Sequence, residues 1–151
     1  MVTKQAVFKL GEGEFGFDIM AVSTVEKYIP MEKAANAPDN MKGIIKLRGD
    51  RIPVYSLRSK FGLENKEPDN DTRLIVTNSN AMTIAYEVDK MLGIINVESE
   101  QLYEVPSIIK STNTAYMKQV TNQDGRLIII MDQNGILSEE EQESLKKALK
   151  L

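Results

Sequence analysis

Three groups of residues in this sequence have types that could support chemistry. Asp18, Glu87 and Asp89 carry carboxylates that could act as acid and base, and Asp69-Asn70-Asp71 looks like the start of a calcium-binding loop. The run from Gly11 to Gly16 matches the G-x-G-x-x-G pattern of phosphate-binding loops. Each group would give the chain a different activity.

The surroundings of these residues argue against all three activities. No spacing pairs the carboxylates as a catalytic acid and base. A calcium loop would need Gly at its sixth position and Glu at its twelfth, where Leu74 and Asn80 stand. In a dinucleotide site the glycine motif opens a helix, but residues 15–19 have the pattern of a strand. A glycine-rich hairpin turn is therefore the better interpretation of residues 11–16.

The composition removes most catalytic and metal chemistry. The 151 residues include no His, no Cys and no Trp. Without His and Cys there is no imidazole base, no thiolate nucleophile and no nitrogen or sulfur ligand for zinc. We therefore expect a protein that is not an enzyme and that binds neither a cofactor nor a metal.

Charge and hydropathy bear on the partners and the location. The formal net charge is −3, which argues against a nucleic-acid partner. No run approaches the ~20 apolar residues of a membrane span, and residues 1–5 do not open a signal peptide. These features predict a cytoplasmic protein without direct membrane insertion.

The stretch from Lys42 to Leu57 predicts the best-defined hairpin. Two apolar runs flank Gly49-Asp50, and a two-residue loop that contains Gly is a strong hairpin signal. Pro53 cannot donate to a ladder, which predicts an edge strand or a bulge at that position. Arg48 and Arg51, at the turn, are either solvated side chains or part of a recognition surface.

Short strands and turns make up most of the remaining chain. Apolar patterns predict strands over 6–10, 15–19, 25–29, 74–77, 82–86, 92–97, 116–121 and 127–131. Asp18 and Ser56 are placed to cap short helical turns after strands. The uninterrupted run from Leu127 to Met131 is typical of a strand buried on both faces. One turn at 98–102 should be followed by a loop through residue 114.

The chain should end in a helix over residues 138–150. Ser138 and Glu141 form a capping box, and lysines occupy the last turn. Leu145, Ala148 and Leu149 form one apolar stripe, which we expect to pack on the same domain.

Hairpins recur on both sides of the polar loop 64–71, which is the best candidate boundary between two halves. No clean sequence repeat accompanies them. Serial hairpins with peripheral helices indicate an all-β, barrel-type fold within a single domain of residues 1–151.

The ordered motifs resemble the CheW-type proteins of bacterial chemotaxis. The run from Gly43 to Gly49, followed by Pro53 and Leu57, is similar to the family signature G-x-x-N-L-R-G-x-x-x-P-x-x-x-L, with Lys46 in place of the usual Asn. Further pieces agree in order: Phe17-Asp18-Ile19, Val88-Asp89 and the run from Asp124 to Ile128. The likeness covers residues 5 to about 137.

The resemblance implies two SH3-like, five-stranded barrels packed around a shared core, with a C-terminal helix. It also implies a non-enzymatic adaptor that couples chemoreceptors to the regulatory domain of a CheA-type histidine kinase in membrane-associated arrays. The receptor-binding groove, facing the cytoplasmic receptor tip, would include Ile19, Val22, Val25, Gly43, Met91 and Ile94, with Arg48 close by.

Each of these assignments has an alternative. Apolar residues suit a groove for a helical hairpin, but the same residue types are usually core. Arg48 could contact a partner, or its guanidinium could tie carbonyls across the two halves. The whole chain could instead be a regulatory module of a histidine kinase, or a small β-barrel that binds nucleic acid or catalyses a reaction.

Overall fold

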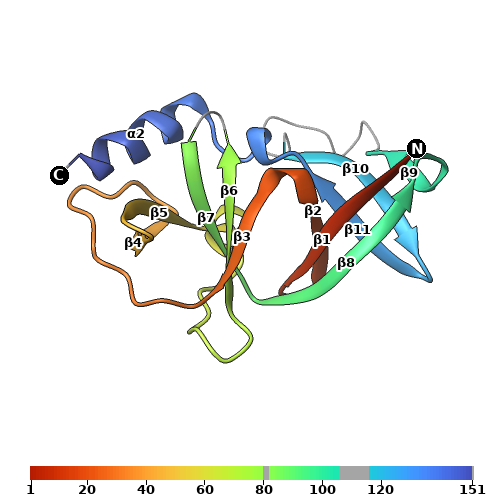
Figure 1. Cartoon of the computed structure of the whole chain (residues 1–151), viewed down its shortest axis with the longest axis horizontal. Helices are drawn as coiled ribbons and strands as arrows, with labels where there is room; N and C mark the ends of the chain where they lie inside the picture. Colours follow the sequence, from red (N-terminus) through yellow and green to blue (C-terminus); the bar gives the residue numbers. More distant parts are fainter. Residues whose placement is uncertain (80–81, 106–115, 151) are drawn as a thin grey trace.

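The computed structural model describes residues 1–79, 82–105 and 116–150, and most of them lie in two β-sheets (Figure 1). The six-stranded sheet has the order β8-β1-β2-β11-β10-β9, and the five-stranded sheet has the order β3-β6-β7-β5-β4. The elements are β1 (Val2–Leu10), β2 (Gly13–Asp18), η1 (Ile19–Ala21), β3 (Val22–Lys27), β4 (Met41–Leu47), β5 (Asp50–Ser56), α1 (Leu57–Lys60), β6 (Arg73–Ser79), β7 (Met82–Val88), β8 (Lys90–Glu98), η2 (Ser99–Gln101), β9 (Leu102–Glu104), β10 (Met117–Gln123), β11 (Arg126–Met131), η4 (Gln133–Gly135) and α2 (Glu139–Leu149).

The predicted mainly β fold with a C-terminal helix is confirmed, with its strands arranged in two sheets. One sheet has six strands instead of the expected five, because the short strand β9 pairs with β10 at its edge. That strand was not predicted. Most of the loop predicted through residue 114 lies outside the described residues.

The strand pairings show that one structural unit occurs twice in the chain. In the five-stranded sheet, β6 and β7 form a hairpin, β7 runs parallel to β5, and β5 forms a hairpin with β4. In the six-stranded sheet, β1 and β2, β11 and β10 repeat these relationships in the same order. The turns also match. The φ values are 51° and 87° in Arg48-Gly49, and 54° and 84° in Asp124-Gly125. Both are left-handed two-residue hairpin turns.

Each unit contributes strands to both sheets. The first unit places β1 and β2 in the six-stranded sheet and β3 to β5 in the other, and the second unit does the reverse. Loop 64–71, the expected boundary, joins α1, which follows β5, to β6 of the same five-stranded sheet. It therefore separates the two units along the chain but does not separate the two sheets, which are interlocked.

Two details of the β4–β5 hairpin differ from the prediction. Leu47 pairs with Asp50, so the two-residue loop is Arg48-Gly49 rather than Gly49-Asp50. β5 is not an edge strand, because it lies between β4 and β7. Pro53 is tolerated because pairing with β7 begins only at Val54. Ser56 caps α1 by accepting a hydrogen bond from the Ser59 N–H, as predicted.

Two strand predictions need correction. The third strand runs over Val22–Lys27 rather than residues 25–29. In β11 the Leu127 side chain is 62% exposed, so the apolar run is not buried on both faces at its start. Burial on both faces begins further along the strand, where Ile128 and Ile130 pack in one cluster and Met131 packs in another.

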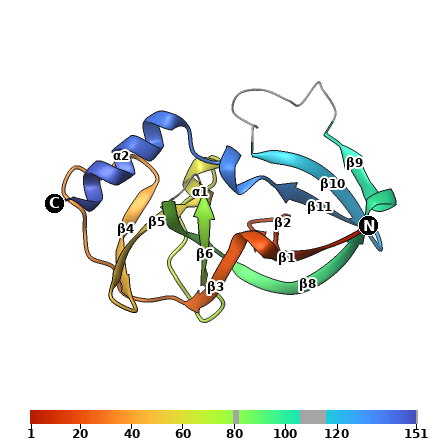
Figure 2. The ribbon, with the colours of Figure 1, turned by 45° about the horizontal axis from the view of Figure 1, so that its top comes forward.

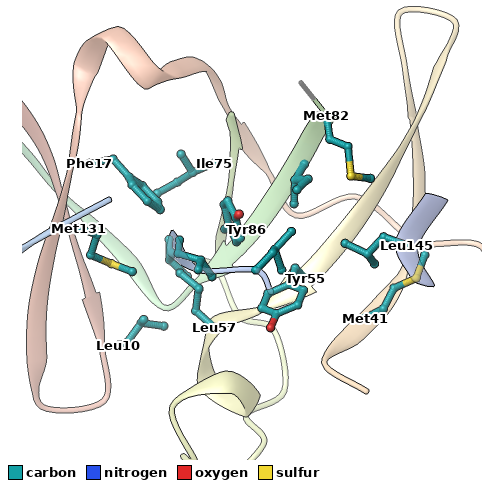
Figure 3. Close-up of a cluster of buried hydrophobic side chains, with 14 of the residues drawn as sticks. Leu10, Phe17, Met41, Tyr55, Leu57, Ile75, Met82, Tyr86, Met131 and Leu145 are labelled. Atoms are coloured by element: carbon teal, nitrogen blue, oxygen red, sulfur yellow. The ribbon is translucent and has the colours of Figure 1, made fainter. Parts of the chain in front are cut away.

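The largest hydrophobic cluster joins the two sheets, as Figure 3 shows. Phe17 of β2 contacts Tyr86 of β7 with ring centroids 5.6 Å apart, and Tyr86 meets Tyr55 of β5 at 5.9 Å. Because these side chains are fully buried, separating the sheets would expose large apolar surfaces to water. The expected shared core is confirmed.

Helix α2 lies across the five-stranded sheet (Figures 1 and 2) and closes the same cluster with Leu145 and Ala148. The predicted capping box of Ser138 and Glu141 is present. The Glu141 carboxylate also accepts hydrogen bonds from Lys60, at 2.8 Å, and from the Tyr55 hydroxyl. Burial and this neighbouring carboxylate raise the pKa of Tyr55. The apolar stripe of the helix therefore packs on its own domain, as predicted.

Candidate functional site

Five of the predicted receptor-facing residues lie on or beside two edge strands. Ile19 is in η1, Val22 and Val25 are in β3, and Met91 and Ile94 are in β8. β3 is an edge of the five-stranded sheet and β8 is an edge of the six-stranded sheet, so each holds the same place in its unit. Figures 1 and 2 show both strands near the junction between the sheets. We call these five residues the edge surface.

The members of the edge surface differ in burial. Val25 is 41% exposed and Ile94 is 60% exposed, whereas Val22 and Met91 are half-buried and pack against the shared core. Some residues of the edge surface are therefore available to a partner, and others belong to the core. Val25 and Ile94 are free to contact a partner, while Val22 and Met91 also stabilise the fold.

Gly43 has a structural reason to be glycine. It is buried in β4, where an added Cβ would lie 2.7 Å from the Glu32 carbonyl oxygen and 2.9 Å from the Met31 Cβ. The chain at Glu32 bridges to Ile44 through two backbone hydrogen bonds of 2.8 Å. Gly43 thus lets two backbone segments approach closely, and it does not join the edge surface.

Arg48 lies in the β4–β5 turn and is exposed. β4 and β3 are at opposite ends of the strand order in their sheet. Within the described part of the chain, the Arg48 side chain has no hydrogen bond or ion pair. No contact therefore supports a structural role in which Arg48 links the two halves. Its contact with a partner stays a prediction.

We expect Arg48→Ala to melt within a few degrees of the parent protein and to lose partner coupling, because no internal contact is removed. Arg48→Gly is the matched control, since glycine adopts the positive φ of this turn more easily than alanine does. Both variants should lose coupling equally if the guanidinium contacts a partner. Normal coupling by either folded variant would contradict this role.

Arg58 makes the inter-sheet tie that the sequence analysis considered for Arg48. From α1, its Nε and Nη2 each donate to one oxygen of Asp89 at 2.7 Å. Asp89 stands between β7 and β8, and it also accepts the Gly11 N–H at 2.8 Å from the β1–β2 turn. Burial alone would raise the pKa of Asp89, but these hydrogen bonds outweigh it and hold the pKa below its usual range. The tie fixes the start of β8 against both sheets.

A second apolar surface was also missed by the sequence analysis. Tyr103, Val120 and Ile129 occupy one rung across β9, β10 and β11, and Leu127 lies on the same face of β11 as Ile129. Tyr103 is 60% exposed and Leu127 is 62% exposed. We call these four residues the sheet face. Two exposed apolar surfaces on different strands suit a protein that binds macromolecules.

Comparisons with known proteins agree with this architecture. The profile of the CheW-like domain matches residues 5–141, which include most of β1, all of β2 to β11 and the start of α2. The chain belongs to the CheW-like family.

Relatives in this family share most of their length with the chain. The chemotaxis protein CheW of Klebsiella aerogenes is 31% identical over 89% of this chain and 81% of its own length. CheW of Bacillus subtilis is 26% identical over 93% and 90%. The crystal structure of the scaffolding protein TtCheW from Thermoanaerobacter tengcongensis superposes with a TM-score of 0.84 at 28% identity, covering 93% of this chain and 96% of that chain. These relationships support a chemotaxis adaptor.

Two of the motifs that carry the family likeness have a structural role. The CheW-like Val88-Asp89 step supplies the carboxylate of the Arg58 tie, and the glycine at position 43 permits a close backbone approach. Across the described residues, no group of three or more acidic side chains is arranged to hold a metal ion. Nor does this part of the chain include a helix long and apolar enough to cross a membrane.

Proposed function

We propose that this CheW-like protein couples chemoreceptors to a CheA-type histidine kinase in the cytoplasm, at membrane-associated receptor arrays, without catalysing a reaction itself. The observation that supports this most is the presence of two exposed apolar surfaces on different strands. An adaptor has to hold two partners at once, so it needs two sites that do not overlap.

The edge surface is the proposed receptor site. A receptor tip is a helical hairpin, and its apolar side chains would cover Val25 and Ile94, which are exposed in the free protein. Burial of apolar area contributes about 25 cal/mol per Å² to such a contact. Residues from both units take part, so this site would depend on the interlocking of the sheets.

The sheet face is the proposed kinase site. Tyr103 and Leu127 combine a large aromatic and a large aliphatic side chain, both mostly exposed, over half-buried neighbours. Exposed aromatic side chains of this kind often carry much of the binding energy of an interface. The regulatory domain of a CheA-type kinase would cover them.

The function is tested by reconstitution from purified parts. Kinase, receptor fragments on vesicles and this protein are mixed, and ATP turnover is compared with and without each component. We expect receptor control of the kinase only when all three are present. ATP turnover by the protein alone, or receptor control without it, would contradict the proposed function.

The two surfaces should be separable by single substitutions. Ile94→Glu places a charge that receptor binding would desolvate, so we expect receptor affinity to fall by about tenfold or more while kinase affinity stays unchanged. Leu127→Glu should show the reverse pattern. Isothermal titration calorimetry of both variants with both partners measures the four affinities.

These positions are better probes than Val22. Val22→Glu would also be expected to weaken receptor binding, but Val22 packs against the shared core, so the substitution would lower stability as well. Ile94 and Leu127 are mostly exposed, and their melting curves should match that of the parent protein. Equal loss of both partners by either folded variant would mean that the two sites overlap.

A further inference from the structure

A cavity of about 330 Å³ opens at one end of the six-stranded sheet, beside η1 and η4. Its lining includes Gln5 of β1, which is only 3% exposed and whose side-chain oxygen has no hydrogen-bond partner among the described residues. Buried acceptors in folded proteins nearly always receive a hydrogen bond. The Gln5 oxygen can therefore accept one from a group that enters the cavity.

The repeated unit gives this cavity a counterpart in the other half. Matching the two hairpin turns and the two parallel strand pairs aligns the units residue by residue. A backbone hydrogen bond recurs on this alignment, from the Ser56 N–H to the Asn40 carbonyl at 2.7 Å and from the Asp132 N–H to the Tyr116 carbonyl at 2.8 Å. The lining of the larger cavity then corresponds to that of a cavity of about 10 Å³. The matched lining residues are Thr3 and Thr72, Asp18 and Glu87, Met20 and Asp89, Lys118 and Lys42, and Asn134 and Arg58.

Two ion pairs fill the smaller cavity. Lys42 binds Glu87 with an N···O distance of 2.6 Å, and Arg58 donates to both oxygens of Asp89 at 2.7 Å. Leu74, the counterpart of Gln5, is fully buried in an apolar cluster. In this half the charged groups therefore satisfy one another, and an apolar residue holds the position of the buried glutamine.

Smaller and less charged side chains surround the larger cavity. Met20 and Asn134 stand where the other half has an aspartate and an arginine. Lys118 and Asp18 correspond to the lysine and the glutamate of the other half, but aspartate is one methylene shorter, and the two side chains form no ion pair in the described part of the chain. Open volume and unpaired polar groups therefore occur together in this half.

The lining favours a neutral ligand group that both donates and accepts hydrogen bonds. Lys118 repels a cation, and the carboxylates of Asp18 and Asp132 repel an anion. Each aspartate accepts a backbone N–H of the adjacent 3-10 helix at 2.9 Å through one oxygen, which leaves its second oxygen for a ligand. A carboxamide group donates through its NH2 to such acceptors, and its oxygen accepts from an ammonium group.

We propose that this cavity receives the carboxamide group of an asparagine or glutamine side chain from the protein that docks on the edge surface. The NH2 group would donate to Gln5 and Asp18, and the amide oxygen would accept from Lys118. Met20, which lines the cavity and is 90% exposed, follows Ile19 of the edge surface in η1. A partner on the edge surface would therefore also cover this side of the cavity. This source of the carboxamide rests on the proposed function, whereas the chemistry of the cavity does not.

The chemistry is tested with small probes on the full chain. Propionamide has the atoms of a glutamine side chain and should give saturable shifts of the NMR signals of the Gln5 side-chain amide and of the Met20 and Asn134 backbone amides. N,N-Dimethylpropionamide has no N–H donor and should bind at least about tenfold more weakly. Propylammonium and propionate test for a charged ligand. The carboxamide site would be overturned by an absence of saturable shifts, by equal binding of the dimethyl analogue, or by tighter binding of either ion.

Two variants locate the binding. Gln5→Leu copies Leu74 of the other half, so it should fold with a melting temperature no lower than that of the parent protein and bind propionamide about tenfold more weakly or worse. Lys118→Met removes the proposed donor at an exposed position and should weaken propionamide binding by about threefold or more. Undiminished binding in a folded Gln5→Leu variant, or in Lys118→Met if Gln5→Leu does not fold, would overturn the site.

The source of the carboxamide is tested with receptor fragments. Gln5→Leu should lower receptor affinity by about threefold to tenfold and leave kinase affinity unchanged. If this variant loses propionamide binding but holds the receptor as tightly as the parent protein does, a partner's side chain is overturned as the ligand. If the parent protein binds no receptor fragment, the proposed function fails and this source fails with it, while the propionamide titration still decides the chemistry of the cavity.

Discussion

Arg58→Met should lower the free energy of unfolding by roughly 2–4 kcal/mol. The substitution keeps an unbranched apolar side chain. Among the described residues it leaves the Asp89 carboxylate, 15% exposed, with the Gly11 N–H as its one hydrogen-bond donor. It also removes the bond from Arg58 Nη1 to the Glu64 carbonyl, at 2.7 Å. Urea denaturation at neutral pH measures the change.

Two comparisons separate the buried tie from an ordinary ion pair. Lys146 and Glu143 form an exposed pair on α2 with an N···O distance of 3.9 Å, and Lys146→Met should change stability by less than about 0.5 kcal/mol. The double variant Arg58→Met with Asp89→Asn should recover part of the loss, because no unpaired charge stays buried. A single Arg58→Met variant as stable as the parent would show that the tie does not hold the sheets.

The contribution of this tie should depend on pH in the acid range. The pKa of Asp89 in the folded protein is held below its unfolded value, so folding favours the ionised form. The stabilisation is present above the unfolded pKa, near 3.9, and is lost as the pH falls through the lower folded value. The difference between the parent protein and Arg58→Met should therefore be largest near neutral pH and shrink as the pH falls below the unfolded pKa.

Local signals in the sequence were enough to predict most of the elements. Alternating apolar residues located the strands, and Ser138 with Glu141 located the start of α2, because such patterns act within a few residues. The same reasoning misplaced the β4–β5 turn by one residue. Gly49 is in the loop as predicted, but Arg48 takes the other left-handed position instead of Asp50.

Long-range pairings are the part that the sequence did not reveal. Arg58 and Asp89 are 31 positions apart, and nothing in the local pattern of either residue indicates the other. The repeated unit was equally hidden, since equivalent residues such as Tyr55 and Met131 share a position and not a type. The family likeness did supply the apolar candidates, but only the fold distinguishes exposed Ile94 from half-buried Val22.

The second large change in stability is expected at Gly43, where β4 lies close to residues 31–32. Gly43→Ala should lower the free energy of unfolding by roughly 2–4 kcal/mol. The new methyl group would lie 2.7 Å from the Glu32 carbonyl oxygen, which is backbone and has little freedom to move. Relief requires residues 31–32 to shift away, at the expense of the two hydrogen bonds between Glu32 and Ile44.

Gly49→Ala is the matched control within the same hairpin. Its Cβ would meet no atom within 4 Å, so only the positive φ of 87° opposes the substitution, at a cost of about 1 kcal/mol. Denaturation curves of both variants, followed by receptor binding at a temperature where each is folded, separate stability from contact. If Gly43→Ala is as stable as the parent protein and still loses receptor affinity, Gly43 contacts the receptor directly. If stability falls and affinity per folded molecule is kept, the glycine serves the backbone approach alone.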